Sequence, residues 1–199
     1  MAFTFFFRDN ESLNLITKYA LPDLKRHQFI RVWDAGCATG PEPYSIAMIL
    51  RENMGQFLFR NVLIYATDLN EGDFAETVAQ GIYPAAELGR IPRDLFCRYF
   101  APNGRPGYYQ VSAELRRAVH FQRHDLLSLQ PVRDDLGLIV CKNVLLHLAP
   151  GQREDVIRMF HRALAADGFL VMEHTQKLPW ETRRLFRQVT SAAQLFQKA

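Results

Sequence analysis

Four runs of apolar residues along the chain predict buried β-strands, at 29–34, 61–67, 136–141 and 169–173. Apolar positions three and four apart predict helices at 11–20, 71–80 and 151–165, and a further helix opened by Pro43. Gly81 is expected to end the helix at 71–80, because glycine accepts the left-handed conformation of a helix C-terminus. Apolar strands that alternate with helices are typical of a parallel sheet covered on both faces. The pattern therefore predicts an α/β fold.

The middle of the chain breaks this rhythm. Residues 81–107 contain four prolines and four glycines, and the segments 108–112 and 117–123 have the pattern of a β-hairpin. We expect a small antiparallel insertion around 98–123 within one domain that spans 1–199. The last residues, 185–198, predict a short helix or turn and an edge strand near Leu195 and Phe196.

A short glycine turn joins the first strand to the next helix. Gly36 and Gly40 allow the backbone to turn tightly and a ligand to approach it. The second strand ends at Asp68, whose carboxylate can accept hydrogen bonds from two ribose hydroxyls. Pro41 and Pro43 remove N–H groups that a pyrophosphate would need at the helix start. This favours a cofactor without phosphates, such as S-adenosylmethionine, over a dinucleotide, with a plain structural turn as the third alternative.

Composition narrows the choice further. The chain has 199 residues, of which 48% are hydrophobic and 23% charged, as in a globular domain. Residues 1–100 hold 10 Lys and Arg against 12 Asp and Glu, whereas residues 101–199 hold 14 against 9. A net charge this small does not indicate a nucleic-acid partner, and an acidic partner would bind the more basic residues 101–199. No apolar run approaches the ~18–20 residues of a membrane span. The three cysteines lack zinc or disulfide spacing and predict buried free thiols, and the six histidines predict no metal site.

Several longer motifs resemble the catalytic domain of the CheR-type methyltransferases, which methylate glutamates of bacterial chemoreceptors. The matching stretches are TFFFR (4–8), VWDAGCATGPEPYSIAM (32–48), YATDLN (65–70), GIYP (81–84), RYF (98–100) and CKNVLL (141–146). The resemblance implies the class I S-adenosylmethionine-dependent methyltransferase fold, a mostly parallel Rossmann-like sheet with a small antiparallel insertion. It also implies S-adenosylmethionine as the cofactor and S-adenosylhomocysteine as the product.

The resemblance assigns roles to individual residues. It places Thr4 and Arg8 beside the reactive end of the cofactor, Glu42 against the cofactor and Asp68 on the ribose. The remaining positions that it assigns to the cofactor pocket are Gly36, Ala38, Asp125, Leu126, Asn143 and Val144. Arg8 and His147 are the predicted catalytic residues. A guanidinium matches a carboxylate in two-point geometry, so we expect Arg8 to orient the substrate, unless it only pairs with Asp9 or Glu11 at the surface.

The sequence departs from the family pattern at several of these positions. Pro41 precedes Glu42 where two acids are usual, Asp125 replaces an Asn, and Lys142 replaces an Arg. His147 replaces a Tyr that faces the methyl group, Gln176 replaces a Glu, and Ala2 replaces an Asn. The first motif begins at Thr4, so we expect the basic helical domain that precedes it in the family to be missing, which weighs against a receptor as the specific substrate. The Phe5–Phe7 run is interpreted as core packing more than as a ligand wall.

The predicted chemistry needs no general base. A glutamate carboxylate, with a pKa near ~4.3, is ionised at pH 7 and can act as the nucleophile directly. The leading hypothesis is O-methylation of glutamate side chains in a protein such as the cytoplasmic region of a chemoreceptor, by a cytoplasmic monomer that neither enters the membrane nor binds nucleic acid. Two alternatives stay open: methylation of a small molecule or another protein, with His147 as base, or a non-catalytic sensor of the cofactor.

Overall fold

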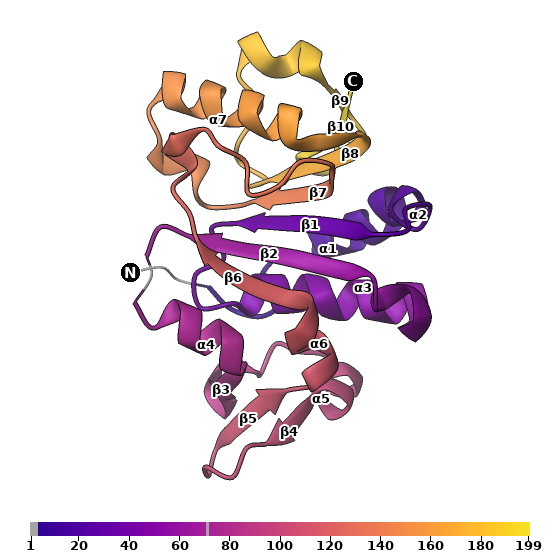
Figure 1. Ribbon diagram of the computed structural model, residues 1–199, viewed down its shortest axis with the longest axis vertical. Helices are drawn as coiled ribbons and strands as arrows, with labels where there is room; N and C mark the ends of the chain where they lie inside the picture. The colour runs from indigo at the N-terminus through magenta and orange to yellow at the C-terminus, as the bar shows by residue number, and fades with distance from the viewer. Residues whose placement is uncertain (1–3, 71) are drawn as a thin grey trace.

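The computed structural model describes residues 4–70 and 72–199. A seven-stranded sheet forms its centre, in the order β6-β2-β1-β7-β8-β10-β9 (Figure 1). Its strands are β1 (Ile30–Ala35), β2 (Val62–Asp68), β6 (Val119–Arg123), β7 (Leu136–Cys141), β8 (Leu164–Met172), β9 (Phe186–Gln188) and β10 (Leu195–Lys198). The pairs from β6 to β8 are parallel, and β10 runs antiparallel to both β8 and β9.

Helices cover both faces of this sheet, as the apolar strands predicted. The longer ones are α3 (Pro41–Phe59) and α7 (Pro150–Ala163), and the shorter ones are α1 (Asn10–Leu15), α2 (Leu21–Leu24), α4 (Phe74–Gln80), α5 (Arg93–Tyr99) and α6 (Ala113–Ala118). Along β1 the side chains alternate between the two faces: Val32 belongs to the core that includes α3, and Trp33 to the core that includes α7. The strands from β6 to β8 run parallel, so their carboxyl ends lie at one common edge of the sheet.

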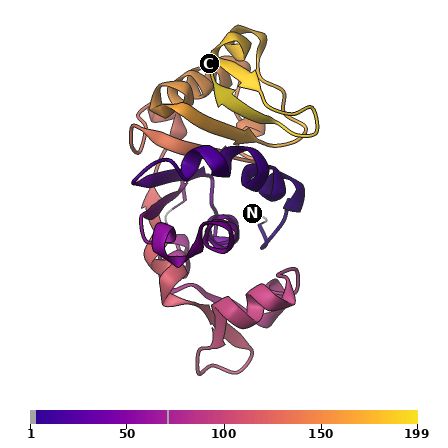
Figure 2. The same ribbon diagram turned by 90° about the vertical axis from the view of Figure 1, so that its right-hand side faces the viewer.

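The predicted hairpin at 108–112 and 117–123 is wrong. The strand β5 (Tyr108–Val111) pairs instead with β3 (Ile82–Pro84) and β4 (Phe100–Pro102), forming a separate three-stranded antiparallel sheet. The helix α6 separates β5 from β6, and β6 joins the edge of the central sheet beside β2. The antiparallel insertion therefore spans 82–111, not 98–123. Figure 2 shows the insertion at one end of the molecule and the C-terminal strands at the other.

Smaller differences from the predicted elements have local causes. The helix predicted from Pro43 begins at Pro41, because proline is well tolerated in the first helical turn. Gly168 lies within β8, at an irregularity opposite Leu136 and Leu138, and not in a turn before it. The strand at 195–198 is interior, since β9 folds back beside it and forms the edge. Gly81 ends α4 with a φ of 61°, as predicted.

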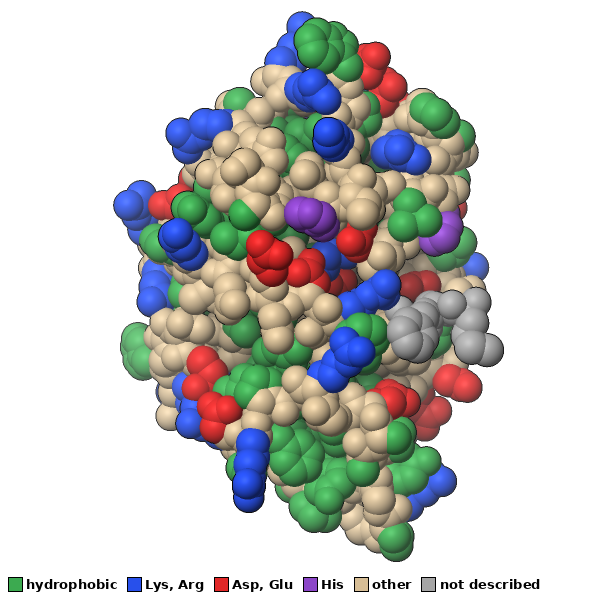
Figure 3. Space-filling view, turned by 180° about the vertical axis from the view of Figure 1, so that it is seen from behind, with side chains coloured by type: hydrophobic (Ala, Val, Ile, Leu, Met, Phe, Trp, Pro, Cys, Tyr) green, Lys and Arg blue, Asp and Glu red, His purple; other side chains and the backbone are tan. Residues whose placement is uncertain are grey.

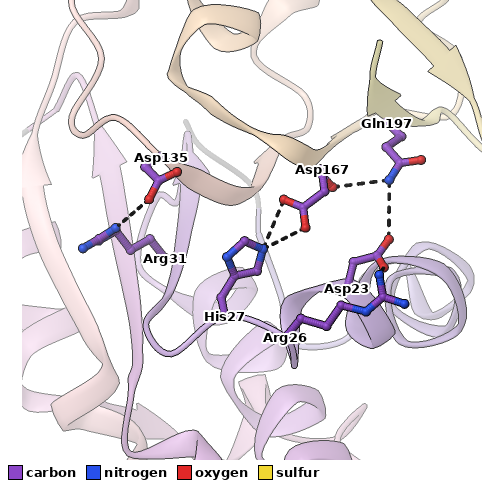
Figure 4. A network of polar contacts seen from close by, with 7 residues as sticks. All are labelled: Asp23, Arg26, His27, Arg31, Asp135, Asp167 and Gln197. Atoms are coloured by element: carbon purple, nitrogen blue, oxygen red, sulfur yellow. Dashed lines mark hydrogen bonds and ion pairs between the residues drawn. The ribbon is translucent and has the colours of Figure 1, made fainter.

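A polar network lies at the amino end of the sheet (Figure 4). The His27 Nε2 atom lies 2.9 Å from an Asp167 carboxylate oxygen, and Arg31 pairs with Asp135 at 3.2 Å. The Gln197 amide reaches the Asp23 carboxylate and the Asp167 carbonyl at 3.4 Å each. These contacts join the start of β1 and the residues before it to Asp135 ahead of β7, to β8 and to β10.

Candidate functional site

A cavity of about 810 Å³ opens at the carboxyl ends of the parallel strands. The loops after β1, β2, β6 and β7 form its walls, together with the segment before α1. All of the predicted site residues line it: Thr4, Arg8, Gly36, Ala38, Glu42, Asp68, Asp125, Leu126, Asn143, Val144 and His147. Its volume lies within the range of small-molecule and cofactor sites, about 300–1,000 Å³. The sequence motifs, far apart in the chain, therefore converge on one site.

The glycine turn brings the backbone close to the opposite wall. Gly36 has a φ of 106°, and a Cβ atom added there would lie 2.1 Å from the Val144 Cγ2 atom. Gly40 has a φ of 100°, and its added Cβ would lie 2.7 Å from the Tyr83 hydroxyl. Both glycines are thus required by conformation and by space.

Two backbone N–H groups fix the position of the Asp68 carboxylate. Ala38 donates a hydrogen bond to one carboxylate oxygen and Asn70 to the other, each at 3.0 Å. The carboxylate therefore ties the loop after β2 to the glycine turn and lies fixed at the cavity wall. This is the position expected of a group that accepts from ribose hydroxyls.

A buried cation forms part of the cavity wall. The side chain of Lys142, which directly follows β7, is 5% exposed, and its Nζ atom lies 2.5 Å from the Glu42 Oε1 atom. The Asp9 Oδ2 atom lies 3.7 Å from the same ammonium. Burial opposes the charge, but the Glu42 carboxylate outweighs it and the pKa of Lys142 is raised. One side chain thereby joins the end of β7, the start of α3 and the N-cap of α1.

Asp9 also caps α1. Its carboxylate accepts hydrogen bonds from the Ser12 backbone N–H at 3.0 Å and from the Ser12 hydroxyl at 2.5 Å. Burial alone would raise the pKa of Asp9, but these hydrogen bonds and the charge of Lys142 outweigh it and lower the pKa.

Asp34 is a buried acid that the sequence reasoning assigned no role. It lies near the end of β1, is 0% exposed, and neither carboxylate oxygen has a hydrogen-bond partner among the described residues. Burial raises its pKa well above the ordinary value, and the nearby Glu42 charge raises it further. The signal available in the sequence was an acid at the end of an apolar strand, directly before a glycine turn.

The segment that leads into α1 forms another wall. Phe6 is fully buried and packs edge-on against Tyr83 and Phe100 of the insertion, with ring centroids 4.9 and 5.6 Å apart. The Phe7 backbone N–H donates to the Ser45 hydroxyl at 3.0 Å. Phe6 and Phe7 are buried in the core, as interpreted, although Phe7 also lines the cavity. Phe5 is half-buried and lines the cavity too.

The predicted catalytic histidine reaches the cavity from a short helical turn, Leu145–His147, after β7. The cavity wall also contains titratable residues that sequence reasoning did not assign to the site: Asp9, Glu11, His124, Lys142, Glu173 and His174. Of the cysteines, Cys37 and Cys141 are buried as predicted, but Cys97 on α5 is exposed. Figure 3 shows acidic, basic and histidine side chains close together across one face of the molecule.

Comparison with known families identifies the domain. The family model described as "CheR methyltransferase, SAM binding domain" matches residues 2–195. The chain belongs to the CheR methyltransferase family. The family assignment inferred from the motifs is thereby confirmed, and S-adenosylmethionine is the cofactor that this domain binds in the family.

Individual relatives agree with this assignment. A chemotaxis protein methyltransferase of Pseudomonas aeruginosa is 32% identical over 176 residues, which cover 87% of this chain and 62% of that protein. One of Vibrio cholerae is 28% identical over 180 residues, with 88% and 62% covered. The chain thus spans about three fifths of the length of these curated relatives.

Solved structures confirm the class I fold. A methyltransferase from Geobacter sulfurreducens superposes with a TM-score of 0.55 at 16% identity, covering 96% of this chain and 80% of that one. PKMT2 from Rickettsia typhi, solved in complex with AdoHcy, gives a TM-score of 0.51 at 14% identity, covering 86% and 26%.

The cavity of this CheR-family domain fits the cofactor by charge. S-adenosylmethionine carries two positive groups, a sulfonium and an ammonium, and one carboxylate. Most charged side chains of the described cavity wall are acidic. Such surroundings favour a ligand with more positive than negative groups.

Proposed function

We propose that this domain transfers a methyl group from S-adenosylmethionine to glutamate side chains of a protein, and that the protein is the cytoplasmic region of a chemoreceptor. The observation that carries the proposal is the convergence of all eleven family-assigned positions on one cavity in a chain of the CheR family. In this proposal the domain acts as a cytoplasmic monomer. None of the described helices has the length and apolarity needed to cross a membrane.

When bound, S-adenosylmethionine would supply the methyl group on its sulfonium sulfur: a carboxylate oxygen would bond to the methyl carbon as the bond from carbon to sulfur breaks, giving a methyl ester and S-adenosylhomocysteine with no proton transferred. The residues of the chain bind and orient. Asp68 holds the ribose, and Glu42, fixed by Lys142, accepts from the ammonium group. Thr4, Gly36, Ala38, Asp125, Leu126, Asn143 and Val144 complete the cofactor contacts.

Arg8 and His147 are assigned to the substrate side of the cavity. The Arg8 guanidinium orients the glutamate carboxylate by two-point hydrogen bonding. His147 replaces the usual Tyr of the family and forms part of the wall that excludes water. Alignment of this kind supplies about 7–11 kcal/mol in favourable cases. No acid or base is required, because a glutamate carboxylate is already ionised at neutral pH.

The test is transfer of radiolabelled methyl groups to membranes rich in a bacterial chemoreceptor. We expect label on the receptor that base releases as volatile methanol, because a carboxyl ester hydrolyses. Base-stable label would contradict carboxyl chemistry and favour an amine or hydroxyl nucleophile with His147 as base. Tight cofactor binding without transfer to receptors, other proteins or small molecules would favour the sensor alternative.

A further inference from the structure

The cavity wall carries more acidic than basic side chains, although the proposed substrate is itself acidic. The acidic side chains on its wall are Asp9, Glu11, Glu42, Asp68, Asp125 and Glu173. Among the described residues that line it, Arg8 and Lys142 supply the only Lys or Arg side chains, and Lys142 is already paired with Glu42. An anionic protein segment is therefore repelled by the wall unless further cations lie at the mouth of the cavity.

A second arginine, on the inserted segment, lies against an aromatic ring of the cavity wall. The Arg90 guanidinium carbon lies 3.9 Å from the centre of the Phe5 ring, and the Arg8 guanidinium carbon lies 5.6 Å from the same centre. Phe5 lines the cavity, so Arg90 is one aromatic ring away from it. Two guanidinium groups thus flank one ring, a stacking arrangement that arginine adopts readily.

Both partners of the stack are fixed by their neighbours. Leu88 and Ile91, on either side of Arg90, are buried, and the Ile91 backbone N–H donates to the Leu88 carbonyl at 3.0 Å. On the other side, Phe5 adjoins the fully buried Phe6. The guanidinium is therefore positioned before any partner binds, which lowers the entropy that binding costs.

The donors of Arg90 are available. The residue is exposed, and no carboxylate of residues 4–70 or 72–199 forms an ion pair with it. A guanidinium that stacks through its face keeps the N–H groups at its edge free for a carboxylate.

We propose that Arg90 is a substrate-recognition residue, which binds a carboxylate of the acidic protein segment that presents the glutamate to the cavity. The Phe5 ring separates Arg90 from the cavity, so this carboxylate is a neighbour of the reacting one on the same segment. The inference rests on the proposed function, since it requires a protein substrate with acidic side chains. It gives the insertion a direct part in selecting that substrate.

Kinetics with receptor-rich membranes test the role. For Arg90→Ala we expect KM for the receptor to rise about tenfold, with kcat and the calorimetric affinity for S-adenosylmethionine within twofold of wild type. Arg90→Lys keeps the charge but loses the planar fork, so its KM should lie in between. Arg60→Ala removes an equal charge at the end of α3 and serves as the matched control. The effect of Arg90→Ala should shrink as salt is added.

An unchanged KM in Arg90→Ala would overturn the inference while leaving the proposed function intact. A parallel loss of kcat, cofactor affinity and melting temperature would also overturn it, because it would reveal a structural role. Failure of the wild-type protein to methylate any receptor would refute the proposed function, and this inference with it.

Discussion

Charged side chains gather at both ends of the central sheet, yet the two groups differ in burial and in pairing. At the amino end, the side chains of His27 and Asp167 are 33% and 39% exposed and pair with each other. At the carboxyl end, Lys142 is almost fully buried among acids, and Asp34 has no partner among the described residues. Burying a charged group without a partner lowers the stability of the folded protein, so such groups are found mainly at functional sites. A buried and incompletely paired cluster therefore indicates a functional site, whereas an exposed and paired one does not.

The same difference is visible in what each group connects. The amino-end network fastens elements that are already packed and leaves its charges in contact with water (Figure 4). The carboxyl-end cluster joins three walls of a cavity through one ammonium. We expect substitutions at the two ends to differ in kind, with cofactor binding affected at one end only.

The largest effect is expected for Lys142→Met. It leaves Glu42 and Asp9 without their shared cation, and breaking a buried ion pair costs about 3–5 kcal/mol of the free energy of unfolding. Thermal denaturation should show a melting temperature lowered by about 6–20 °C. Calorimetry should show weaker S-adenosylmethionine binding, and Lys142→Arg, which retains the charge, should restore both. A Met variant as stable as wild type would show that the contacts of Lys142 with Glu42 and Asp9 do not stabilise the fold.

Arg8→Ala should act on turnover. We expect kcat for receptor methylation to fall about 10–100-fold, since the group that orients the carboxylate is lost, while cofactor affinity falls less. Initial rates and calorimetry on one preparation measure the two quantities. Wild-type turnover would remove Arg8 from the mechanism.

Asp68→Ala should act on cofactor affinity, with a loss of about tenfold or more, because a charged acceptor of two ribose hydrogen bonds disappears. Calorimetric titration with S-adenosylhomocysteine measures this without turnover. The variant also leaves the Ala38 and Asn70 backbone N–H groups without their acceptor, so a small fall in melting temperature is expected as well. Unchanged affinity would refute the ribose assignment.

Asp34→Asn should stabilise the protein at neutral pH. The folded-state pKa of Asp34 is raised, so the aspartate contributes most favourably at low pH and loses stability as pH rises from the unfolded value of ~3.9 toward the folded value. The amide of the Asp34→Asn variant does not ionise, so the stability of the variant does not fall with pH at this position. The melting temperature should therefore increase at pH 7.5, and the increase should be smaller near pH 4. A gain that does not depend on pH would argue against the carboxyl as its cause.

The smallest effect is expected at the amino end. His27→Ala removes a half-exposed pair with Asp167, and such pairs contribute about 0.2–1 kcal/mol. We expect the melting temperature to fall by no more than about 4 °C, with cofactor affinity unchanged. Weakened cofactor binding in this variant would break the distinction between the two ends.

The sequence predicted the carboxyl end of the sheet well because its signals are local. A buried strand, a glycine turn and a helix follow one another directly at 30–59, and Asp68 ends the next strand. Parallel strands bring such ends to a common edge, so placement follows from chain direction alone. The motifs shared with the CheR family then pointed to further cavity residues by position, but not to Asp9, Glu11, His124, Lys142, Glu173 or His174.

The insertion was predicted poorly because its pairing is not local. The segments 108–112 and 117–123 both have strand character, but hairpin pairing also requires that nothing intervene. The helix α6 turns the chain away, and β5 finds its partners before it in the chain. Alternating apolar residues predict that a segment is a strand, but they do not predict which other strand it pairs with.

By itself the sequence determined the fold class, the family and the edge of the sheet where the cofactor site lies, because these follow from periodicity, glycine placement and contiguous motifs. Only the tertiary structure decided that Lys142 pairs with Glu42, that Asp34 is buried with no hydrogen-bond partner among the described residues, and that Arg90 stacks on Phe5. These relations join residues far apart in the chain, and their energies depend on distance and burial, which arise only when the chain is packed.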